Sequence, residues 1–241
     1  MITLICYRPA FGEPSMSSFC IKTMALLNLS GQKWNVEWAD MPKASPTGKL
    51  PAIRVGQKVV PDSNLILSWL EGQGADLFPG LSRREKAQAH AFMRMLEEHL
   101  RYGVVYDRWA DADGWAGVKN VIFKPVPFLL RGMVASKIRK QIVRGLHWNG
   151  IARYSEDQRR ELLISDLKAL EDQLEGGDWL FGTQATAADC SALGILSNID
   201  NCPTPNFMRA YVKGSDVLQS YLARCRSQLL QPVSALTAVA A

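Results

Sequence analysis

Three short segments within the first 65 residues carry side chains that can bind or activate a small anionic ligand. The first, Ser17-Ser-Phe-Cys-Ile-Lys, opens a predicted helix that follows a strand-like segment. A helix N-terminus presents free N–H groups and the positive end of the helix dipole. A hydroxyl there can donate a hydrogen bond to a thiolate, the ionised form of a thiol whose free pKa is about 8.5. Ser17 is therefore a candidate for holding a thiolate, and its alternative role is a simple N-cap.

The second segment, Gly48-Lys-Leu-Pro-Ala-Ile, has a proline at the start of a predicted strand, where proline is unusual because it cannot donate to a sheet. A cis peptide bond between Leu50 and Pro51 would turn the backbone of Leu50 outward. Its N–H and C=O could then pair with a peptide-like ligand, as a short strand does. An ordinary trans proline at a strand edge is commoner and remains the alternative.

The third segment is Pro61-Asp-Ser, a turn that leads into a helix. The N–H and hydroxyl of Ser63 can bind a carboxylate at the helix N-terminus, and Asp62 can hold an ammonium group. Capping of the helix alone would also account for both residues.

The elements that must position these segments alternate between strand and helix. β-Forming runs and helical spacing predict strands at 2–7, 33–38, 52–55 and 58–60, and helices at 15–29 and from residue 62 or 63 to about 71. The last two strands flank a tight Gly56-Gln57 turn, which predicts a hairpin. This order predicts a small mixed sheet with helices on its faces.

Beyond a linker at 72–81, rich in glycine, the pattern is helical. Helices are predicted at 83–109, 131–148, 156–174, 186–200 and 216–230, followed by a frayed tail after Pro232. Thr186 and Asp189 have the spacing of a capping box. We therefore predict two domains, 1–75 and 82–241.

Composition excludes several classes of protein. The 241 residues are 47% hydrophobic, and no apolar run is long enough to span a bilayer. The five cysteines form no CxxC pair and the three histidines form no ligand-like cluster, so we expect neither a disulfide framework nor a metal site. With no recognisable secretory signal, a reducing, cytoplasmic location is expected.

The positive charge is concentrated in one segment. Residues 119–160 contain ten Lys or Arg and two Asp or Glu, whereas the rest of the chain is slightly acidic. We interpret this segment as a solvated helix face. The alternatives are an anionic substrate, a membrane surface and a nucleic acid, and we expect no nucleic acid partner.

Taken together, the motifs resemble those of the glutathione transferases over nearly the whole chain. The resemblance rests on Ser17, on Ser45-Pro-Thr-Gly-Lys-Leu-Pro, on Val60-Pro-Asp-Ser, and on Trp179-Leu-Phe-Gly-Thr-Gln-Ala-Thr-Ala-Ala-Asp. It implies a thioredoxin-like α/β N-terminal domain followed by an all-α C-terminal domain. Gly150-Ile-Ala-Arg-Tyr-Ser and Pro14-Ser-Met-Ser-Ser-Phe-Cys are similar to the branch that contains failed-axon-connections and metaxin-like proteins, some of which are not known primarily as enzymes.

The resemblance implies a role for each site residue. Glutathione would be bound by Lys49, Leu50, Pro51, Asp62 and Ser63, with the backbone of Leu50 pairing with the cysteinyl unit and Lys49 facing the glycyl carboxylate. Transferases of this shape are commonly homodimers, which we expect here.

Two residues, Ser17 and Tyr7, are candidates for activating the thiol. The family's usual Ser-Pro or Cys-Pro pair is replaced by Ser17-Ser18, and Tyr7 lies where tyrosine-type transferases keep their hydroxyl. We prefer Ser17, because its helix register fits. Lowering the thiol pKa by about two units corresponds to roughly 2.7 kcal/mol, which one hydroxyl and a helix terminus can supply.

The leading hypothesis is therefore a transferase that conjugates the glutathione thiolate to a small electrophile. The electrophile would lie near Phe11 and the helices between His99 and Trp115. One alternative is a glutathione-dependent thiol–disulfide reductase, for which Cys20 is the positional candidate. The other is a non-catalytic binding or scaffold protein that uses the basic segment as its partner surface.

Overall fold

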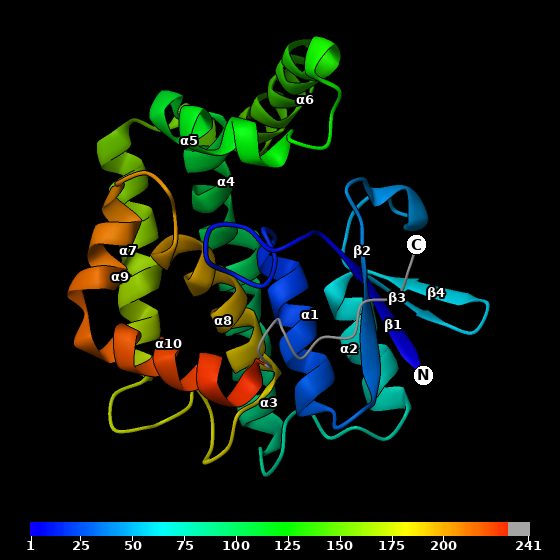
Figure 1. The fold of residues 1–241 in the computed structure, drawn as a ribbon. Helices are drawn as coiled ribbons and strands as arrows, with labels where there is room; N and C mark the ends of the chain where they lie inside the picture. The colour runs from blue at the N-terminus through cyan, green and yellow to red at the C-terminus, as the bar shows by residue number, and fades with distance from the viewer. Residues whose placement is uncertain (231–241) are drawn as a thin grey trace.

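The computed structural model describes residues 1–230, so the tail predicted after Pro232 lies outside the described residues. Four strands form one mixed sheet in the order β2-β1-β3-β4 (Figure 1). Their bounds are β1 (Ile2–Cys6), β2 (Trp34–Trp38), β3 (Ala52–Val55) and β4 (Lys58–Pro61). β1 runs parallel to β2, pairing Ile2 with Trp34, and antiparallel to β3. β3 and β4 form the predicted hairpin.

Two helices, α1 (Ser18–Leu29) and α2 (Ser63–Gly72), complete this first unit. The prediction that α1 begins at Ser15 was wrong by three residues. The backbone of Ser17 is extended, at φ −108° and ψ 124°, and the Ser15 hydroxyl donates a hydrogen bond to the carbonyl of Tyr7 (2.8 Å). Ser15 is therefore bound to the end of the first strand segment and cannot start the helix.

Beyond Leu81, the regular elements of the described chain are all helices. They are α3 (Arg83–Met95), a π-helical turn η2 (Leu96–Leu100), α4 (Arg101–Trp109), α5 (Ala112–Ile122), α6 (Phe128–Asn149), α7 (Glu156–Gln173), α8 (Ala187–Asp200), α9 (Phe207–Gly214) and α10 (Asp216–Leu229). Single-turn 3-10 segments lie at Pro42–Ala44 and Ile151–Arg153. These helices and the mixed sheet confirm the predicted fold, a thioredoxin-like α/β domain followed by an all-α domain.

Four details of the helical part differ from the sequence prediction. The long helix predicted at 83–109 is interrupted by η2, whose wider turn accommodates an extra residue. α6 begins three residues early, directly after Pro127. α5 was not predicted, although it has 11 residues and an Asp111 N-cap. α9 was not predicted either; it is only eight residues long and follows a segment with two prolines, Pro203 and Pro205.

α8 lies at the centre of the molecule, and all 14 of its residues are buried. Its start confirms the predicted capping box: Thr186 accepts from the N–H of Ala188, and the Asp189 carboxylate accepts from the N–H of Thr186 (2.7 Å). α8 packs along α1, which Figure 1 shows between the sheet and the helical domain. A Cβ on Gly194 would lie 2.3 Å from the carbonyl oxygen of Ser18, so glycine is what allows this close approach.

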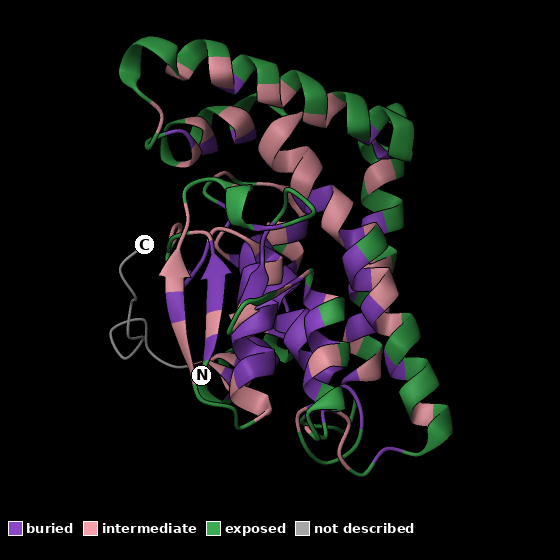
Figure 2. Cartoon of the chain, turned by 90° about the vertical axis from the view of Figure 1, so that its right-hand side faces the viewer, coloured by how far each residue is buried: buried purple, intermediate pink, exposed green. Residues whose placement is uncertain are grey.

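Burial is uneven across the two domains. Figure 2 shows buried residues concentrated in the sheet and the helices beside it, whereas α6 is largely exposed along its length. No helix within residues 1–230 is long and apolar enough to cross a membrane.

Candidate functional site

Ser17 occupies the N-cap position of α1, but its side chain does not bond to the N–H groups of the helix. Its carbonyl accepts hydrogen bonds from the N–H groups of Cys20 and Ile21 (3.0 and 3.1 Å). The side chain is half-buried and lies against the thiol of Cys20. The hydroxyl is thus placed at the positive end of a helix without being used to cap it.

Cys20 lies one turn into α1 and is completely buried, next to the equally buried Cys6. Burial acts to raise the pKa of the Cys20 thiol. The neighbouring Cys6 thiol and Tyr7 backbone, followed by the hydroxyls of Ser17 and Ser15, outweigh this effect and bring that pKa below its ordinary value. Because Cys20 is completely buried, the lowered pKa describes its own sulfur and not that of a bound ligand.

Tyr7, the second candidate for thiol activation, follows β1 and is half-buried. Burial, together with the neighbouring Cys20, raises the pKa of its phenol to about 12. The group therefore stays protonated at neutral pH and can donate a hydrogen bond to a thiolate. Tyr7 and Ser17 both lie close to Cys20, so the structure brings the two candidate hydroxyls to the same end of α1.

The peptide bond between Leu50 and Pro51 is cis, as the sequence analysis suggested. The side chain of Leu50 is buried in the core, whereas the preceding Lys49 is exposed. The carbonyl of Pro51 accepts a hydrogen bond from the N–H of Asp62 (3.1 Å). The proline loop is therefore connected directly to the turn that begins α2.

Asp62 and Ser63 occupy that turn. Asp62 has a positive φ of 67°, caps α2 by accepting from the N–H of Asn64 (2.8 Å), and is otherwise exposed. Ser63 is 1% exposed, and its hydroxyl has no hydrogen-bond partner within residues 1–230. A buried hydroxyl without a partner is uncommon, and this one lies at a helix N-terminus, where a ligand carboxylate binds well. Ser63 and Asp62 thus fit the γ-glutamyl end of glutathione.

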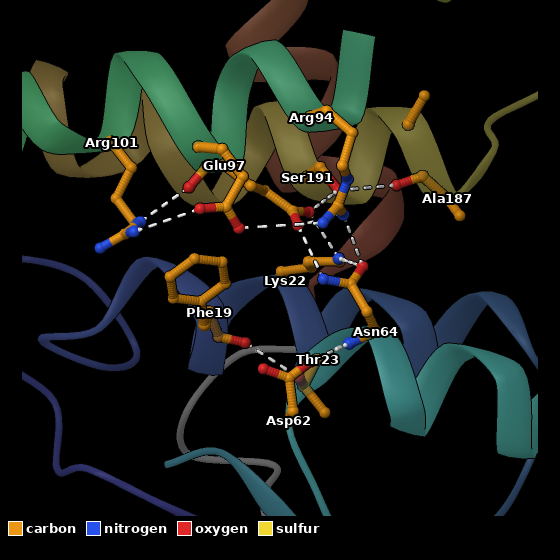
Figure 3. Close-up of polar contacts among 12 residues, drawn as sticks. Phe19, Lys22, Thr23, Asp62, Asn64, Arg94, Glu97, Arg101, Ala187 and Ser191 are labelled. Atoms are coloured by element: carbon orange, nitrogen blue, oxygen red, sulfur yellow. Dashed lines mark hydrogen bonds and ion pairs between the residues drawn. The ribbon is translucent and has the colours of Figure 1, made fainter. Parts of the chain in front are cut away.

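A buried polar network, which the sequence analysis did not predict, joins this site to the helical domain (Figure 3). Its centre is Glu97, in the π-helical turn η2, which is 1% exposed. Lys22 of α1 donates to Glu97 (2.5 Å) and to the Asn64 side-chain oxygen (2.8 Å). Arg94 and Ser191 each donate to Glu97 at 2.6 Å.

The network fixes the charge of its central carboxylate. Burial acts to raise the pKa of Glu97, but the Lys22 ammonium and the hydroxyl and amide donors bring that pKa below its ordinary value. Because Asn64 directly follows Ser63 and Lys22 lies in the second turn of α1, the network holds the N-terminal turns of α1 and α2 beside each other.

A second contact between the domains lies beside Ser17. Arg108 of α4 donates to the carbonyl of Met16 (2.9 Å), and its guanidinium lies 5.5 Å from the centre of the Phe11 ring. Phe11 and α4 were predicted to border the electrophile, and Arg108 adds a cation there. A groove of about 980 Å³ on the outer surface of α7 and α9 lies away from all these residues, and we assign it no part in the site.

The comparisons with known proteins follow this geometry. Residues 18–114 match the family described as glutathione S-transferase N-terminal domain, and residues 163–225 match the corresponding C-terminal domain. The isoprene-epoxide–glutathione S-transferase of Rhodococcus sp. strain AD45 is 32% identical over 95% of this chain and 99% of that protein.

Two further relatives represent the predicted branch. Metaxin-1 of Sus scrofa is 24% identical over 90% of this chain and 72% of its own length, and the Failed axon connections protein of Drosophila melanogaster is 27% identical over 77% and 47%. Among solved structures, the β-etherase LigF from Sphingobium sp. strain SYK-6 superposes with a TM-score of 0.68 at 20% identity, covering 96% of each chain. The chain belongs to the glutathione S-transferase superfamily, in the branch that it shares with the metaxins and Failed axon connections.

Proposed function

We propose that this protein is a glutathione transferase that joins the glutathione thiolate to a small electrophile. One observation carries the proposal. Ser63, whose buried hydroxyl is unpartnered within the described chain, lies at the start of α2 beside Asp62, whose N–H donates to the carbonyl of Pro51 in the cis Leu50–Pro51 loop. A solely structural turn gains nothing from a buried hydroxyl left unpaired, since that group loses its hydration without compensation.

Each residue has a proposed part in holding glutathione. Ser63 and the free N–H groups of α2 bind the γ-glutamyl carboxylate, and Asp62 binds the neighbouring ammonium group. The Leu50 backbone pairs with the cysteinyl unit, with Pro51 holding the loop, and the exposed Lys49 faces the glycyl carboxylate. Ser17 donates to the sulfur at the N-terminus of α1, with Tyr7 as the alternative donor.

We propose an epoxide as the first electrophile to test, because the Rhodococcus relative is named for one. In such a reaction the sulfur forms a bond to an epoxide carbon, the carbon–oxygen bond breaks, and the oxygen takes up a proton from water. A small electrophile bound next to Ser17 would lie near Arg108, which donates to the carbonyl of Met16, and near Phe11, whose ring the Arg108 guanidinium faces.

Calorimetric titration with glutathione tests the proposal. The variants are Ser17→Ala, Tyr7→Phe and Asp62→Asn, and the absorbance of the bound thiolate is followed against pH. Asparagine is chosen at 62 because it tolerates a positive φ and retains an oxygen for capping. Asp76→Asn, an exposed acidic residue outside the site, is the matched control.

Binding that Asp62→Asn weakens and Asp76→Asn does not would support the site. Loss of the thiolate signal in one hydroxyl variant would identify the residue that activates the thiol. Absence of binding at millimolar glutathione would contradict the proposal.

A thiol–disulfide reductase remains the second candidate, favoured by the lowered pKa of Cys20. Its complete burial opposes this role, since exchange requires attack on or by an accessible sulfur. A Cys20→Ala variant that keeps the wild-type rate of glutathione-dependent disulfide reduction would exclude it. Loss of all glutathione-dependent disulfide reduction in that variant would establish it.

A non-catalytic binding protein is the third candidate, because metaxin and Failed axon connections are relatives. It predicts a folded protein that does not bind glutathione. We further propose a cytoplasmic location and a homodimer. Fractionation of the source cells and light scattering on the purified protein test these two proposals.

A further inference from the structure

The outer face of α6 combines exposed apolar residues with unpaired cations. Residues three or four apart share one face of a helix. One exposed stripe therefore runs along the whole length of α6, formed by Leu129, Met133, Lys137, Lys140, Arg144 and Trp148. Leu129 is 91% exposed and Trp148 is 78% exposed, so neither belongs to a core within the described chain. The stripe is apolar at both ends and basic between them.

The cations of this stripe have no partner within residues 1–230, in contrast to the other two on α6. Arg131 donates to the carbonyls of Lys124 and Val126, and Arg139 donates to those of Trp109 and Ala110, so both fasten α6 to its neighbours. The three basic side chains of the stripe make no hydrogen bond or ion pair within residues 1–230; they are Lys137, Lys140 and Arg144. α6 itself contains no acidic residue.

The C-terminal end of the stripe borders a shallow basic pocket of about 450 Å³. Its lining includes the cationic groups of Lys140, Arg144 and Arg153, together with His147 and Trp148. Several cations close together suit a phosphate group. The exposed indole beside them favours the boundary between water and a hydrocarbon layer, so the pocket suits a phosphate group at that boundary.

We propose that this face of α6, which we call the α6 stripe, docks on a bilayer that contains anionic phospholipids. The apolar ends enter the headgroup region, and the cations between them meet lipid phosphates. A second copy of the chain is the poorer occupant, because a two-fold contact would bring the same cations together. A nucleic acid would use the cations and leave Leu129 and Met133 exposed to water.

Co-sedimentation with phosphatidylcholine vesicles, prepared with and without phosphatidylserine, tests this docking on the full-length protein. Lys137→Gln/Lys140→Gln/Arg144→Gln removes the free cations, and Leu129→Ser/Met133→Ser removes one apolar end. Arg83→Gln/Arg84→Gln/Lys86→Gln, exposed at the start of α3, is the matched charge control. Leu162→Ser/Val217→Ser, also exposed, is the matched apolar control.

We expect binding that requires phosphatidylserine, weakens with salt, and falls roughly 100-fold in the triple α6 variant, at about fivefold per cation. The apolar α6 variant should also bind less, while both controls bind as the wild type does. Equal binding to neutral vesicles, or equal losses in the controls, would overturn the proposal. So would binding to duplex DNA but not to vesicles, or a dimer that Leu129→Ser/Met133→Ser converts to monomers without any vesicle binding.

Discussion

Lys22 and Glu97 form a completely buried ion pair that joins the two domains. The ammonium lies 2.5 Å from the carboxylate, and each side chain is 1% exposed. Charges taken out of water are stable only when their partners and hydrogen bonds are complete. Asn64, Arg94 and Ser191 supply the remaining partners of Glu97. The pair therefore links the orientation of the helical domain to the turn that carries Ser63.

The first prediction concerns that pair. Lys22→Met should lower the free energy of unfolding by about 3–5 kcal/mol, because it leaves a buried carboxylate without its main counter-charge. Lys22→Met/Glu97→Gln should lower the free energy of unfolding by less than Lys22→Met alone does, since it also removes the Glu97 carboxylate charge that would be left uncompensated. Urea unfolding measures both values.

The control for this prediction is Glu98→Gln, at a side chain that is 56% exposed, which should change stability by less than about 0.5 kcal/mol. A double variant less stable than the single one would show that charge compensation is not what the pair provides.

A second prediction concerns the close approach of α1 and α8. Gly194→Ala places a Cβ 2.3 Å from the Ser18 carbonyl oxygen and 3.3 Å from the Lys22 nitrogen, both of them backbone atoms. The helices must separate, which we expect to cost about 1–3 kcal/mol and to weaken glutathione binding by displacing Ser17. Gly145→Ala, in α6 with nothing nearby, should instead stabilise by about 0.5–1 kcal/mol. Thermal unfolding that ranks the two alanines in the reverse order would disprove the close-packing argument.

A third prediction separates ligand binding from folding at Ser63. Ser63→Ala removes a buried hydroxyl that lacks a partner within the described residues, so the free energy of unfolding should rise by up to about 1 kcal/mol. Glutathione binding should become weaker in the same variant. Ser68→Ala, on the exposed side of α2, removes a hydroxyl that donates to the Asn64 carbonyl and should leave glutathione binding unchanged. Calorimetry measures the change in glutathione affinity, and urea unfolding of the same samples measures the change in stability. A Ser63→Ala protein that binds glutathione as the wild type does would show that this residue is not part of the site.

The fourth prediction is a pH dependence of stability set by Asp107 of α4. Burial, reinforced by the nearby Asp111, raises the pKa of Asp107 to about 7, and one carboxylate oxygen has no partner within the described residues. The folded protein thus retains a proton that the unfolded chain releases near pH 4. The stability that this proton gives to the folded protein is fully present below about pH 4 and is lost as pH rises through about 7.

Asp107→Asn should abolish this loss of stability with rising pH. The free energy of unfolding of the variant should therefore exceed that of the wild type by about 1–3 kcal/mol between about pH 5 and pH 8. Asp113→Asn, exposed on α5, should retain the wild-type dependence of stability on pH. Urea unfolding across this pH range measures the difference, and parallel curves for wild type and Asp107→Asn would refute the assignment.

Local signals were sufficient for most of the fold. The hairpin turn at Gly56-Gln57 and the alternation beside it predicted β3 at its observed bounds, and the spacing of Thr186 and Asp189 predicted the start of α8. These features depend on residues that are close in the sequence. The π-helical turn was missed because an apolar helical pattern continues through it, and the extra residue alters only the backbone hydrogen bonds.

The polar network could not be predicted in the same way. Lys22, Asn64, Glu97 and Ser191 lie far apart in the sequence, and only tertiary packing brings them together. One local signal was present: Lys22 is the single charged residue of α1, and Glu97 lies between Leu96 and Leu100 on a buried face. A cation and a carboxylate on two predicted buried faces indicate a pair, because neither is buried alone at an acceptable cost.

The glycine at 194 restricts how the two halves of this chain can be exchanged. A first domain recombined from a distant relative would have to place its backbone at position 18 equally close to Gly194, and would meet an acidic residue at 97 that requires a cation at the position of Lys22. Chimaeras that keep residues 22, 64, 97, 191 and 194 from a single parent should assemble, and those that mix them should not. The two domains therefore have to be inherited together, although their architectures differ, because the residues that join them must match.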